Sequence, residues 1–118
     1  MDEENSILNS VKIDCGITAE YTYFDQTLIR YINLVFLTLW QLGVGPDSPY
    51  SINDEYDLWS SFSENANIIG MVKPYISMKV RLMFDPPTSS FVLDALKKQT
   101  EEYEWRLNVS AETPSFNV

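Results

Sequence analysis

The sequence predicts a small all-α protein, a bundle of about four to five helices with a long loop after the second helix and an extended C-terminal tail. Three observations lead to this prediction. Apolar residues recur with the 3.6-residue period of a helix in several segments. Glycine and proline gather mainly between those segments, where helices have to end. The chain has 118 residues, 45% of them apolar, which suffices for one domain with a modest core.

The first helix is expected to begin at Asn5 or Ser6 and to stop near Gly16. Asparagine and serine side chains cap helix N-termini, and glycine readily takes the left-handed conformation found just after a helix. The apolar face is narrow and consists of Ile7, Leu8, Val11 and Cys15. A connector over residues 16–23 follows.

The second helix has the clearest pattern, and we expect it from Asp25 as N-cap to Leu42, with Gly43 ending it. One broad arc is apolar and contains Leu28, Ile29, Tyr31, Ile32, Val35, Phe36, Leu39, Trp40 and Leu42. Leu34 and Leu37 fall instead in the opposite, polar stripe, where a monomer gains nothing by exposing them. The simpler interpretation is that another segment of the chain covers these two leucines. The alternative is that they are subunit contacts.

The segment 43–49, Gly-Val-Gly-Pro-Asp-Ser-Pro, predicts a loop, because glycine and proline alternate in it with turn-forming polar residues. A short extended piece over residues 50–52 follows it. Asp54 or Asp57 is then expected to cap a short third helix that carries Leu58, Trp59 and Phe62.

The fourth helix is expected from Asn65 or Asn67 to Phe84, with a wide apolar face. Pro74 lies inside it, where a proline removes a backbone hydrogen bond and costs ~3 kcal/mol. We therefore expect a kink or a break near residues 71–73. Lys79 falls within the apolar face, where a lysine most simply extends to a polar edge. A buried ion pair is the next interpretation of this lysine.

The structural turn Asp85-Pro86-Pro87 ends the fourth helix, because a residue before proline disfavours the helical conformation. A fifth helix, capped within residues 88–90, is expected to end near Leu107. Its narrow apolar seam consists of Val92, Leu96, Tyr103 and Leu107. Oppositely charged residues four apart support the helix, namely Lys97 with Glu101, Lys98 with Glu102, and Glu102 with Arg106.

Residues 108–118 show no periodicity. We therefore expect a single helical domain over residues 1–107 and an extended C-terminal tail over 108–118. Trp105, just before this boundary, points away from the apolar seam of its helix.

Residue types that carry catalysis or bind metals are scarce. The chain has no histidine, which removes the commonest general base and any Cys/His zinc site. The single cysteine, Cys15, lacks a histidine partner and is interpreted as a small core residue. The acidic residues Asp54, Glu55 and Asp57 lack the glycine and the closing glutamate of a calcium-binding loop. We expect no enzyme activity, no cofactor and no metal site.

The charge balance excludes further classes of function. The chain has 17 acidic residues against 8 basic ones, a formal net charge of −9. Binding of nucleic acid or of anionic membranes needs a basic surface, which this chain lacks. The N-terminus, Met-Asp-Glu-Glu, does not read as a secretory signal. No apolar stretch approaches the ~20 residues that cross a bilayer, so a reducing, intracellular compartment is the default expectation.

Three stretches together resemble a known family. They are Ile-Asn-Leu-Val-Phe at 32–36 running into Gln-Leu-Gly-Val-Gly-Pro at 41–46, then Val-Arg-Leu-Met-Phe-Asp-Pro-Pro at 80–87, and Glu-Trp-Arg-Leu-Asn-Val at 104–109. In this order and spacing the chain is similar to the head–tail connector, or neck adaptor, proteins of siphoviruses that infect Gram-positive bacteria. The resemblance extends from Ser6 to Val109. Pro74 departs from the family pattern, which has an ordinary helix former there.

The resemblance implies a structural virion protein without enzyme activity, located in the neck between capsid and tail and made in the host cytoplasm. It would form a twelvefold ring beneath the portal, extend the DNA channel and dock the next neck, stopper or tail protein. DNA would pass through without specific binding, and no membrane would be involved. The candidate portal contacts are Trp105, Asn108, Val109, Phe116 and Val118. Trp105 is explained equally well by a contact with the tail or with the long loop.

The net charge is unevenly distributed along the chain. Residues 1–64 carry 11 acidic and two basic residues, whereas residues 65–118 carry six of each. For a ring around DNA, we expect the acidic half on the lumen or the outer surface and the neutral half at the portal. The main alternative is a small acidic phage-encoded inhibitor that mimics DNA. A third is a helical interaction module with an unrelated partner.

Overall fold

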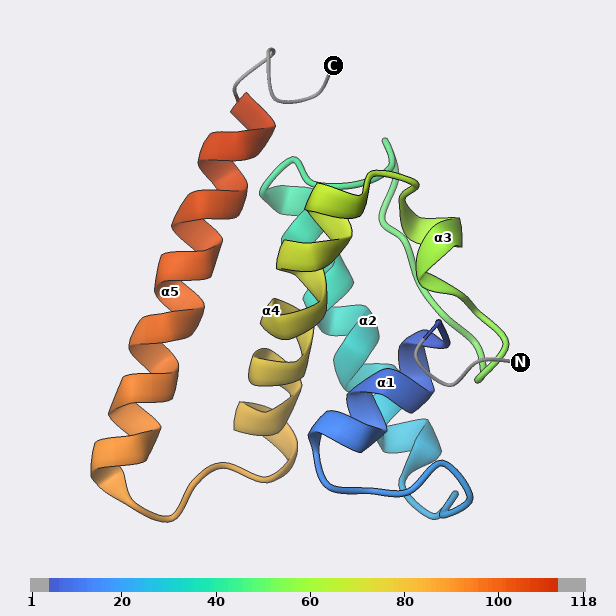
Figure 1. The fold of residues 1–118 in the computed structure, drawn as a ribbon, viewed down its shortest axis with the longest axis vertical. Helices are drawn as coiled ribbons and strands as arrows, with labels where there is room; N and C mark the ends of the chain where they lie inside the picture. Colours follow the sequence, from blue (N-terminus) through green and yellow to red (C-terminus); the bar gives the residue numbers. More distant parts are fainter. Residues whose placement is uncertain (1–4, 113–118) are drawn as a thin grey trace.

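The computed structural model describes residues 5–112, and this part of the chain consists of five α-helices without a β-strand. In chain order they are α1 (Ile7–Asp14), α2 (Asp25–Gln41), α3 (Trp59–Phe62), α4 (Ala66–Phe84) and α5 (Ser90–Glu112) (Figure 1). The predicted all-α class and the approximate number of helices are confirmed.

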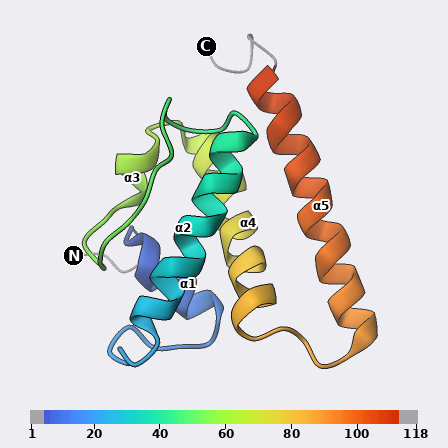
Figure 2. The same ribbon diagram turned by 180° about the vertical axis from the view of Figure 1, so that it is seen from behind.

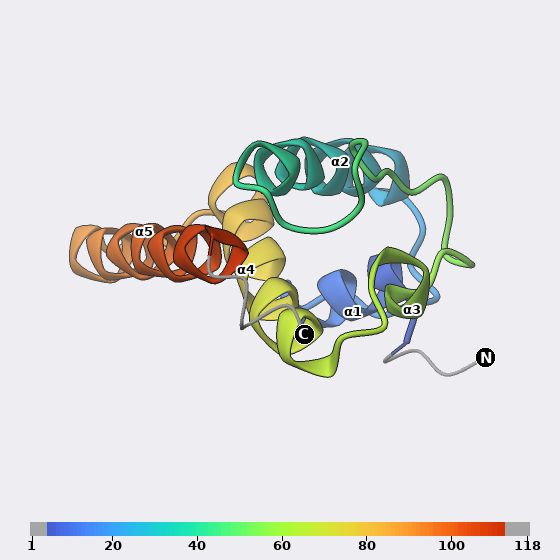
Figure 3. The same ribbon diagram turned by 90° about the horizontal axis from the view of Figure 1, so that it is seen from above.

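The core lies between α1, α2 and α4, which surround a common centre when the molecule is seen from above (Figure 3). Each of these helices contributes fully buried aliphatic side chains, such as Leu8, Ile32 and Ile76. Burial of one such side chain contributes ~1.5–3 kcal/mol, so these three helices provide most of the apolar stabilisation. In the same view α5 lies outside α4, at the edge of the molecule.

The N-terminus of α1 is tied to the segment before α3. Ser6 caps α1 as predicted, because its Oγ accepts a hydrogen bond from the Asn9 N–H at 3.2 Å. The same hydroxyl donates to the Glu55 carbonyl at 2.6 Å. An isolated antiparallel bridge between Ser6 and Leu58 completes the junction. One serine therefore joins segments 49 residues apart.

The long loop between α2 and α3 runs back alongside α2, as the view from behind shows (Figure 2). Asn33 on α2 holds it there: its side chain accepts from the Ile52 N–H at 2.8 Å and donates to the Ile52 carbonyl at 3.1 Å. The rings of Phe36, Tyr50 and Phe62 pack against one another beside this clamp, with centroids 5.0–5.5 Å apart. The loop is thus a fixed part of the fold.

Two predicted helix caps are wrong. The N-cap of α2 is Phe24, and Asp25 is the first helical residue, because its carboxylate pairs with Lys12 on α1 instead of capping its own helix. The N-cap of α3 is Leu58, which makes no side-chain capping bond. Asp57 accepts hydrogen bonds from the N–H groups of Asn53 and Asp54 within the preceding turn, so the acidic residues there stabilise the loop.

Helix α4 runs without interruption through Pro74, so of the predicted kink or break the break does not occur. Asn65 caps its N-terminus by accepting from the N–H groups of Asn67 and Ile68, which supports the turn before the proline. The carbonyl that loses its donor belongs to Gly70, an exposed residue with open space where a side chain would be. Water can reach this carbonyl, which reduces the cost of the missing bond.

Helix α5 is longer than predicted. It continues to Glu112, so residues 108–112 are helical and not part of an extended tail. Tertiary contacts explain the extension: Leu107 is buried, and the Asn108 side chain donates to the Leu42 carbonyl at 3.3 Å. The first proline after the end of α5 is Pro114. The rest of the predicted tail, 113–118, lies outside the described residues.

The predicted seam of α5 is correct except at Val92. Leu107 is buried, and Tyr103 and Leu96 are half-buried, whereas Val92 near the start of the helix is exposed. Of the three predicted ion pairs only Glu102 with Arg106 forms. No acidic side chain of the described residues pairs with Lys97 or Lys98.

Candidate functional site

The outer face of α2 exposes two leucines side by side. Leu34 is 51% exposed and Leu37 is 41% exposed. Within residues 5–112 no segment covers them, so in this part of the chain the interpretation that another segment covers them is wrong. The reason is the path of the long loop, which the Asn33 clamp holds along one flank of α2. The two leucines, one turn apart, therefore form an exposed apolar surface.

The C-terminal half of α5 is anchored to α4 through one carboxylate. The Glu104 carboxylate accepts a hydrogen bond from the Tyr75 hydroxyl at 2.6 Å and lies 3.4 Å from the Lys79 ammonium. Both side chains are about one-third exposed, so Lys79 extends to a polar edge as first predicted and pairs there, and the alternative of a buried ion pair is wrong. Burial of Tyr75, together with its bond to Glu104, raises the pKa of the tyrosine far above its ordinary value. Tyr75 remains a neutral donor at every physiological pH.

This anchor fixes the direction in which Trp105 points. The neighbouring residue Glu104 faces α4, so Trp105 faces away and is 67% exposed, in agreement with the prediction. Val109, four residues later on the same face, is also exposed. Asn108 points inward to the Leu42 carbonyl and positions the helix end. The other two predicted portal contacts, Phe116 and Val118, lie outside the described residues.

A half-open pocket of about 420 Å³ lies beside the C-terminal end of α5. The loop after α2 and the start of α4 form its walls, with Phe62 and Ile68 as apolar lining and Ala111 as the contribution of α5. Gly45 is required here, since its φ is +99° and an added Cβ would lie 2.7 Å from the Phe62 ring. None of the described residues that line the pocket is charged.

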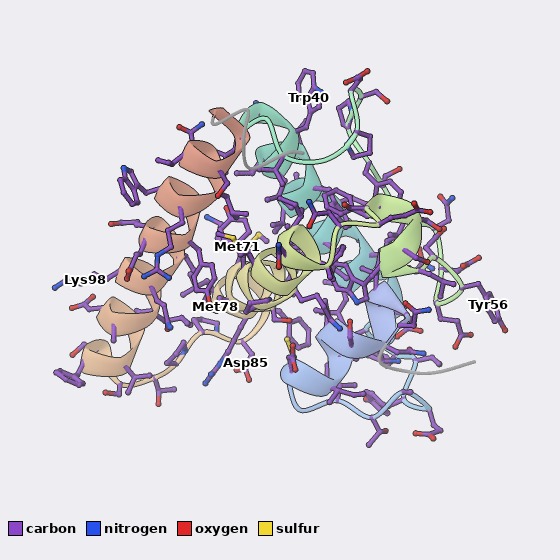
Figure 4. The ribbon with its side chains drawn as sticks, turned by 45° about the horizontal axis from the view of Figure 1, so that its top comes forward. Trp40, Tyr56, Met71, Met78, Asp85 and Lys98 are labelled. Carbon is purple, nitrogen blue, oxygen red and sulfur yellow. The ribbon has the colours of Figure 1, made fainter. Side chains whose placement is uncertain are left out.

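The turn at Asp85-Pro86-Pro87 joins α4 to α5 as predicted. The Asp85 N–H donates to the Arg81 carbonyl at 2.9 Å and closes α4, and the three residues lead directly into α5. Figure 4 labels Asp85 at this junction. Ser89 caps the following helix by accepting from the Val92 N–H. The turn thereby connects the end of α4 to the cap of α5.

One polar cluster was not predicted from the sequence. Lys12 on α1 is only 1% exposed, and its ammonium lies 2.8 Å from the Asp25 carboxylate and 2.9 Å from the Ala19 carbonyl. It thereby joins α1, the connector and the start of α2. A lysine on the apolar side of the first helix was the available signal, because a buried lysine requires a partner. No sequence spacing identifies Asp25 as that partner.

Cys15 is not activated as a nucleophile in this structure. Burial, aided by the neighbouring Asp14 carboxylate, raises the pKa of the Cys15 thiol to about 11, which makes it a poor nucleophile. Within the described residues no three potential metal ligands come together. No described helix is both long and apolar enough to cross a membrane.

Comparison with known proteins gives one match. A family model described as "Phage connector protein" matches residues 7–114. The matched range includes all five helices, with the exposed leucines of α2, the Asp-Pro-Pro turn and Trp105. No curated protein and no solved structure matches the chain.

Proposed function

Because the chain belongs to the phage connector protein family, we propose that it is a head–tail connector whose copies form a ring beneath the portal. The ring extends the DNA channel and docks the next neck or tail component. The family match carries this proposal, because it extends over nearly the whole chain and includes every described helix. A structural role agrees with the set of exposed side chains, which are suited to contact with other proteins.

The distribution of exposed apolar side chains supports assembly. Leu34 and Leu37 lie on α2, while Trp105 and Val109 lie on α5, so contact residues occur on two different helices. Exposed apolar surface of this kind marks interaction sites in soluble proteins. A closed ring needs two different surfaces on each copy, one for each neighbour. A connector also needs a separate surface for the portal.

We assign these surfaces to different partners. Leu34 and Leu37 contact a neighbouring subunit, whereas Trp105 and Val109 contact the portal together with the tail residues Phe116 and Val118. Asn108 supports this second surface indirectly, because its bond to Leu42 holds the last turns of α5 in place. The ring has the twelvefold symmetry of the portal.

The charge distribution fits a channel through which DNA moves freely. The chain has a net charge of −9, and all of this excess lies within residues 1–64. A carboxylate-rich wall repels the DNA backbone, so DNA passes without binding. The protein is thus a component of the virion neck, made in the host cytoplasm, and it needs no enzyme activity. We expect the virus to be a siphovirus of a Gram-positive host.

The experiment is to measure the mass of the chain alone and after mixing with the portal protein of the same virus, with negative-stain imaging of both samples. Free rings of the protein, or a collar of its copies on the portal, are the expected result.

L34S/L37S should reduce ring closure while single copies still bind portals, and Trp105→Ala should weaken portal binding. Ile13→Ser, at an exposed isoleucine of α1, is the control that should change neither.

A chain that ignores portals and instead binds a nuclease or another DNA-binding protein would refute the connector proposal. That result would favour the DNA-mimic alternative. Monomers in the absence of portals agree with the proposal, provided that collars form on portals.

A further inference from the structure

The connector between α1 and α2 exposes two aromatic side chains at one end of the molecule. Tyr21 is 51% exposed and Tyr23 is 78% exposed. The centroids of their rings lie 6.4 Å apart, and both rings pack on Phe24, with centroid distances of 6.0 and 4.9 Å. Phe24 in turn meets Phe84 at the end of α4, at 5.0 Å. We call Tyr21, Tyr23, Phe24 and Phe84 the aromatic patch.

The inner part of the aromatic patch belongs to the fold, whereas its outer part does not. Phe24 and Phe84 are half-buried and pack against the core. The connector is held beside them, because the buried Lys12 ammonium donates to the Ala19 carbonyl at 2.9 Å. The two tyrosines rest on this packed base and expose most of their rings. Folding of a single copy accounts for the two phenylalanines but not for the exposed tyrosines.

Acidic side chains predominate around the aromatic patch. The exposed acidic residues of segments 12–25 and 81–87 are Asp14, Glu20 and Asp85. The exposed basic residue of these two segments is Arg81, and Lys12 is buried in its pair with Asp25. Even if Arg30, further along α2, is included, exposed acidic residues outnumber exposed basic ones by three to two. The surroundings of the aromatic patch therefore favour a positively charged partner.

The aromatic patch lies at the opposite end of the molecule from the C-terminal end of α5. In Figure 1 the connector after α1 and the last turn of α4 are at the bottom of the view, and α5 ends at the top. The view from behind has the same arrangement (Figure 2). The proposed portal contacts Trp105 and Val109 are in the C-terminal half of α5. The chain thus has exposed aromatic surface towards both ends.

We propose that the aromatic patch is the surface on which the next neck or tail component docks, through a protein segment that presents a basic side chain next to apolar ones. A lysine or arginine is attracted to the face of a tyrosine ring, and the surrounding carboxylates add to this attraction. Exposed tyrosines often anchor protein–protein contacts. The inference rests on the proposed function, and it specifies the surface that the chain offers away from the portal.

The observations favour this partner over DNA, the portal and a neighbouring copy. The excess of acidic side chains around the aromatic patch repels the DNA backbone. The proposed portal surface is at the other end of the molecule. Neighbouring copies in a ring lie side by side, and Leu34 and Leu37 on α2 are the surface assigned to them. A component stacked on the ring needs a surface at the end that faces away from the portal.

The test uses collars of the chain on portals of the same virus, with each of the other purified neck and tail proteins of that virus added in turn. One of them should bind wild-type collars. Y21S/Y23S, which removes both exposed rings, should weaken this binding by about tenfold or more, because truncating anchor tyrosines has effects of this size. Biolayer interferometry measures the change. The same variant should still form collars, because both tyrosines lie outside the subunit and portal surfaces.

Three further variants serve as controls and test the charge. Y21F/Y23F keeps both rings and should bind like the wild type. Tyr56→Ser removes a tyrosine that is 64% exposed outside the aromatic patch, and it should also bind normally. E20Q/D85N removes two of the surrounding charges and should make binding weaker and less dependent on salt. Circular dichroism of every variant verifies that the helices are intact.

The outcomes separate this inference from the proposed function. Normal binding by Y21S/Y23S collars, or wild-type collars that bind none of the proteins, would overturn the docking surface and leave the connector proposal standing. Loss of collars in Y21S/Y23S would make the aromatic patch a subunit or portal contact and would also overturn it. An unchanged salt dependence in E20Q/D85N would contradict a basic docking segment. Failure of the wild type to assemble on portals would overturn the connector proposal, and with it this inference.

Discussion

At the scale of single residues, the buried ion pair between Lys12 and Asp25 is the most consequential polar contact. The Lys12 side chain is almost completely buried, while Asp25 keeps partial contact with solvent. A buried pair of this kind contributes little compared with apolar residues of similar volume, but removing one partner leaves an uncompensated charge. The pair therefore specifies how α1 meets α2 more than it stabilises the protein.

This asymmetry predicts different costs for two substitutions. Asp25→Asn keeps the shape but leaves the buried ammonium without its counter-ion, and should reduce the free energy of unfolding by about 3 kcal/mol. Lys12→Met removes the buried charge itself and should cost less. Urea unfolding of both variants measures the difference. An Asp25→Asn variant more stable than Lys12→Met would contradict this account.

Cys15 gives a prediction for pH dependence. Its pKa in the folded protein is about 11, above the ordinary thiol value of 9.0. The folded state therefore keeps a proton that the unfolded state releases, so stability falls as the pH rises from about 9 to about 11. In the Cys15→Ser variant, stability should decline less steeply over this pH range, as measured by thermal unfolding.

In the wild type, alkylation of Cys15 at pH 8 should be at least about tenfold slower than that of free cysteine, because little thiolate is present.

At the scale of elements, α4 and α5 each have one feature that governs their geometry. Helix α4 accommodates Pro74 in its middle, and α5 is anchored by Glu104 near its C-terminal end. The second half of α5 is anchored at Glu104 and Leu107, whereas Phe91 and Val92 at its start are exposed. The Asp-Pro-Pro turn connects the two helices.

The proline in α4 can be tested directly. Pro74→Ala restores the N–H that can donate to the Gly70 carbonyl, and removes a penalty of up to ~3 kcal/mol. We expect a variant that is more stable by about 1–2 kcal/mol, since exposure of Gly70 already reduces the cost. Thermal unfolding measures the gain. A loss of stability would mean that the pyrrolidine ring provides packing that outweighs the missing hydrogen bond.

At the scale of the whole molecule, the net charge of −9 is a destabilising term. Ion pairs such as Lys12–Asp25, Lys79–Glu104 and Glu102–Arg106 oppose it, and the last of these is the most exposed. Like charges spread over a small protein repel one another, and salt screens this repulsion over ~10 Å at 0.1 M. The same repulsion disfavours non-specific association between copies.

The excess of like-charge repulsion over ion pairing predicts how stability responds to salt. Raising sodium chloride from 0.05 to 0.5 M should increase the melting temperature, because screening relieves more repulsion than it weakens attraction. The mostly buried Lys12–Asp25 pair is little affected. Differential scanning fluorimetry across this range measures the shift. A melting temperature that falls with salt would show that attractive pairs dominate.

Much of the fold could be predicted from local sequence signals. Ser6 and Asn65 cap their helices as expected, and the Asp-Pro-Pro turn ends α4. Such features depend on neighbouring residues, because a cap or a turn involves hydrogen bonds within a few positions. The predictions that proved wrong depend on residues distant in the chain. Asp25 does not cap α2 because it pairs with Lys12, and α5 continues past Leu107 because Asn108 donates to the Leu42 carbonyl.

The sequence by itself determined the all-α class, the approximate positions of the helices and the outward direction of Trp105. Periodicity, caps and turn residues act over one or two turns, so they can be read without knowing the fold. Only the tertiary structure decided that Leu34 and Leu37 are uncovered, and that Phe24 meets Phe84. Those facts depend on the path of the long loop and on how α2 packs beside α4. Both are set by packing between segments that are distant in the chain.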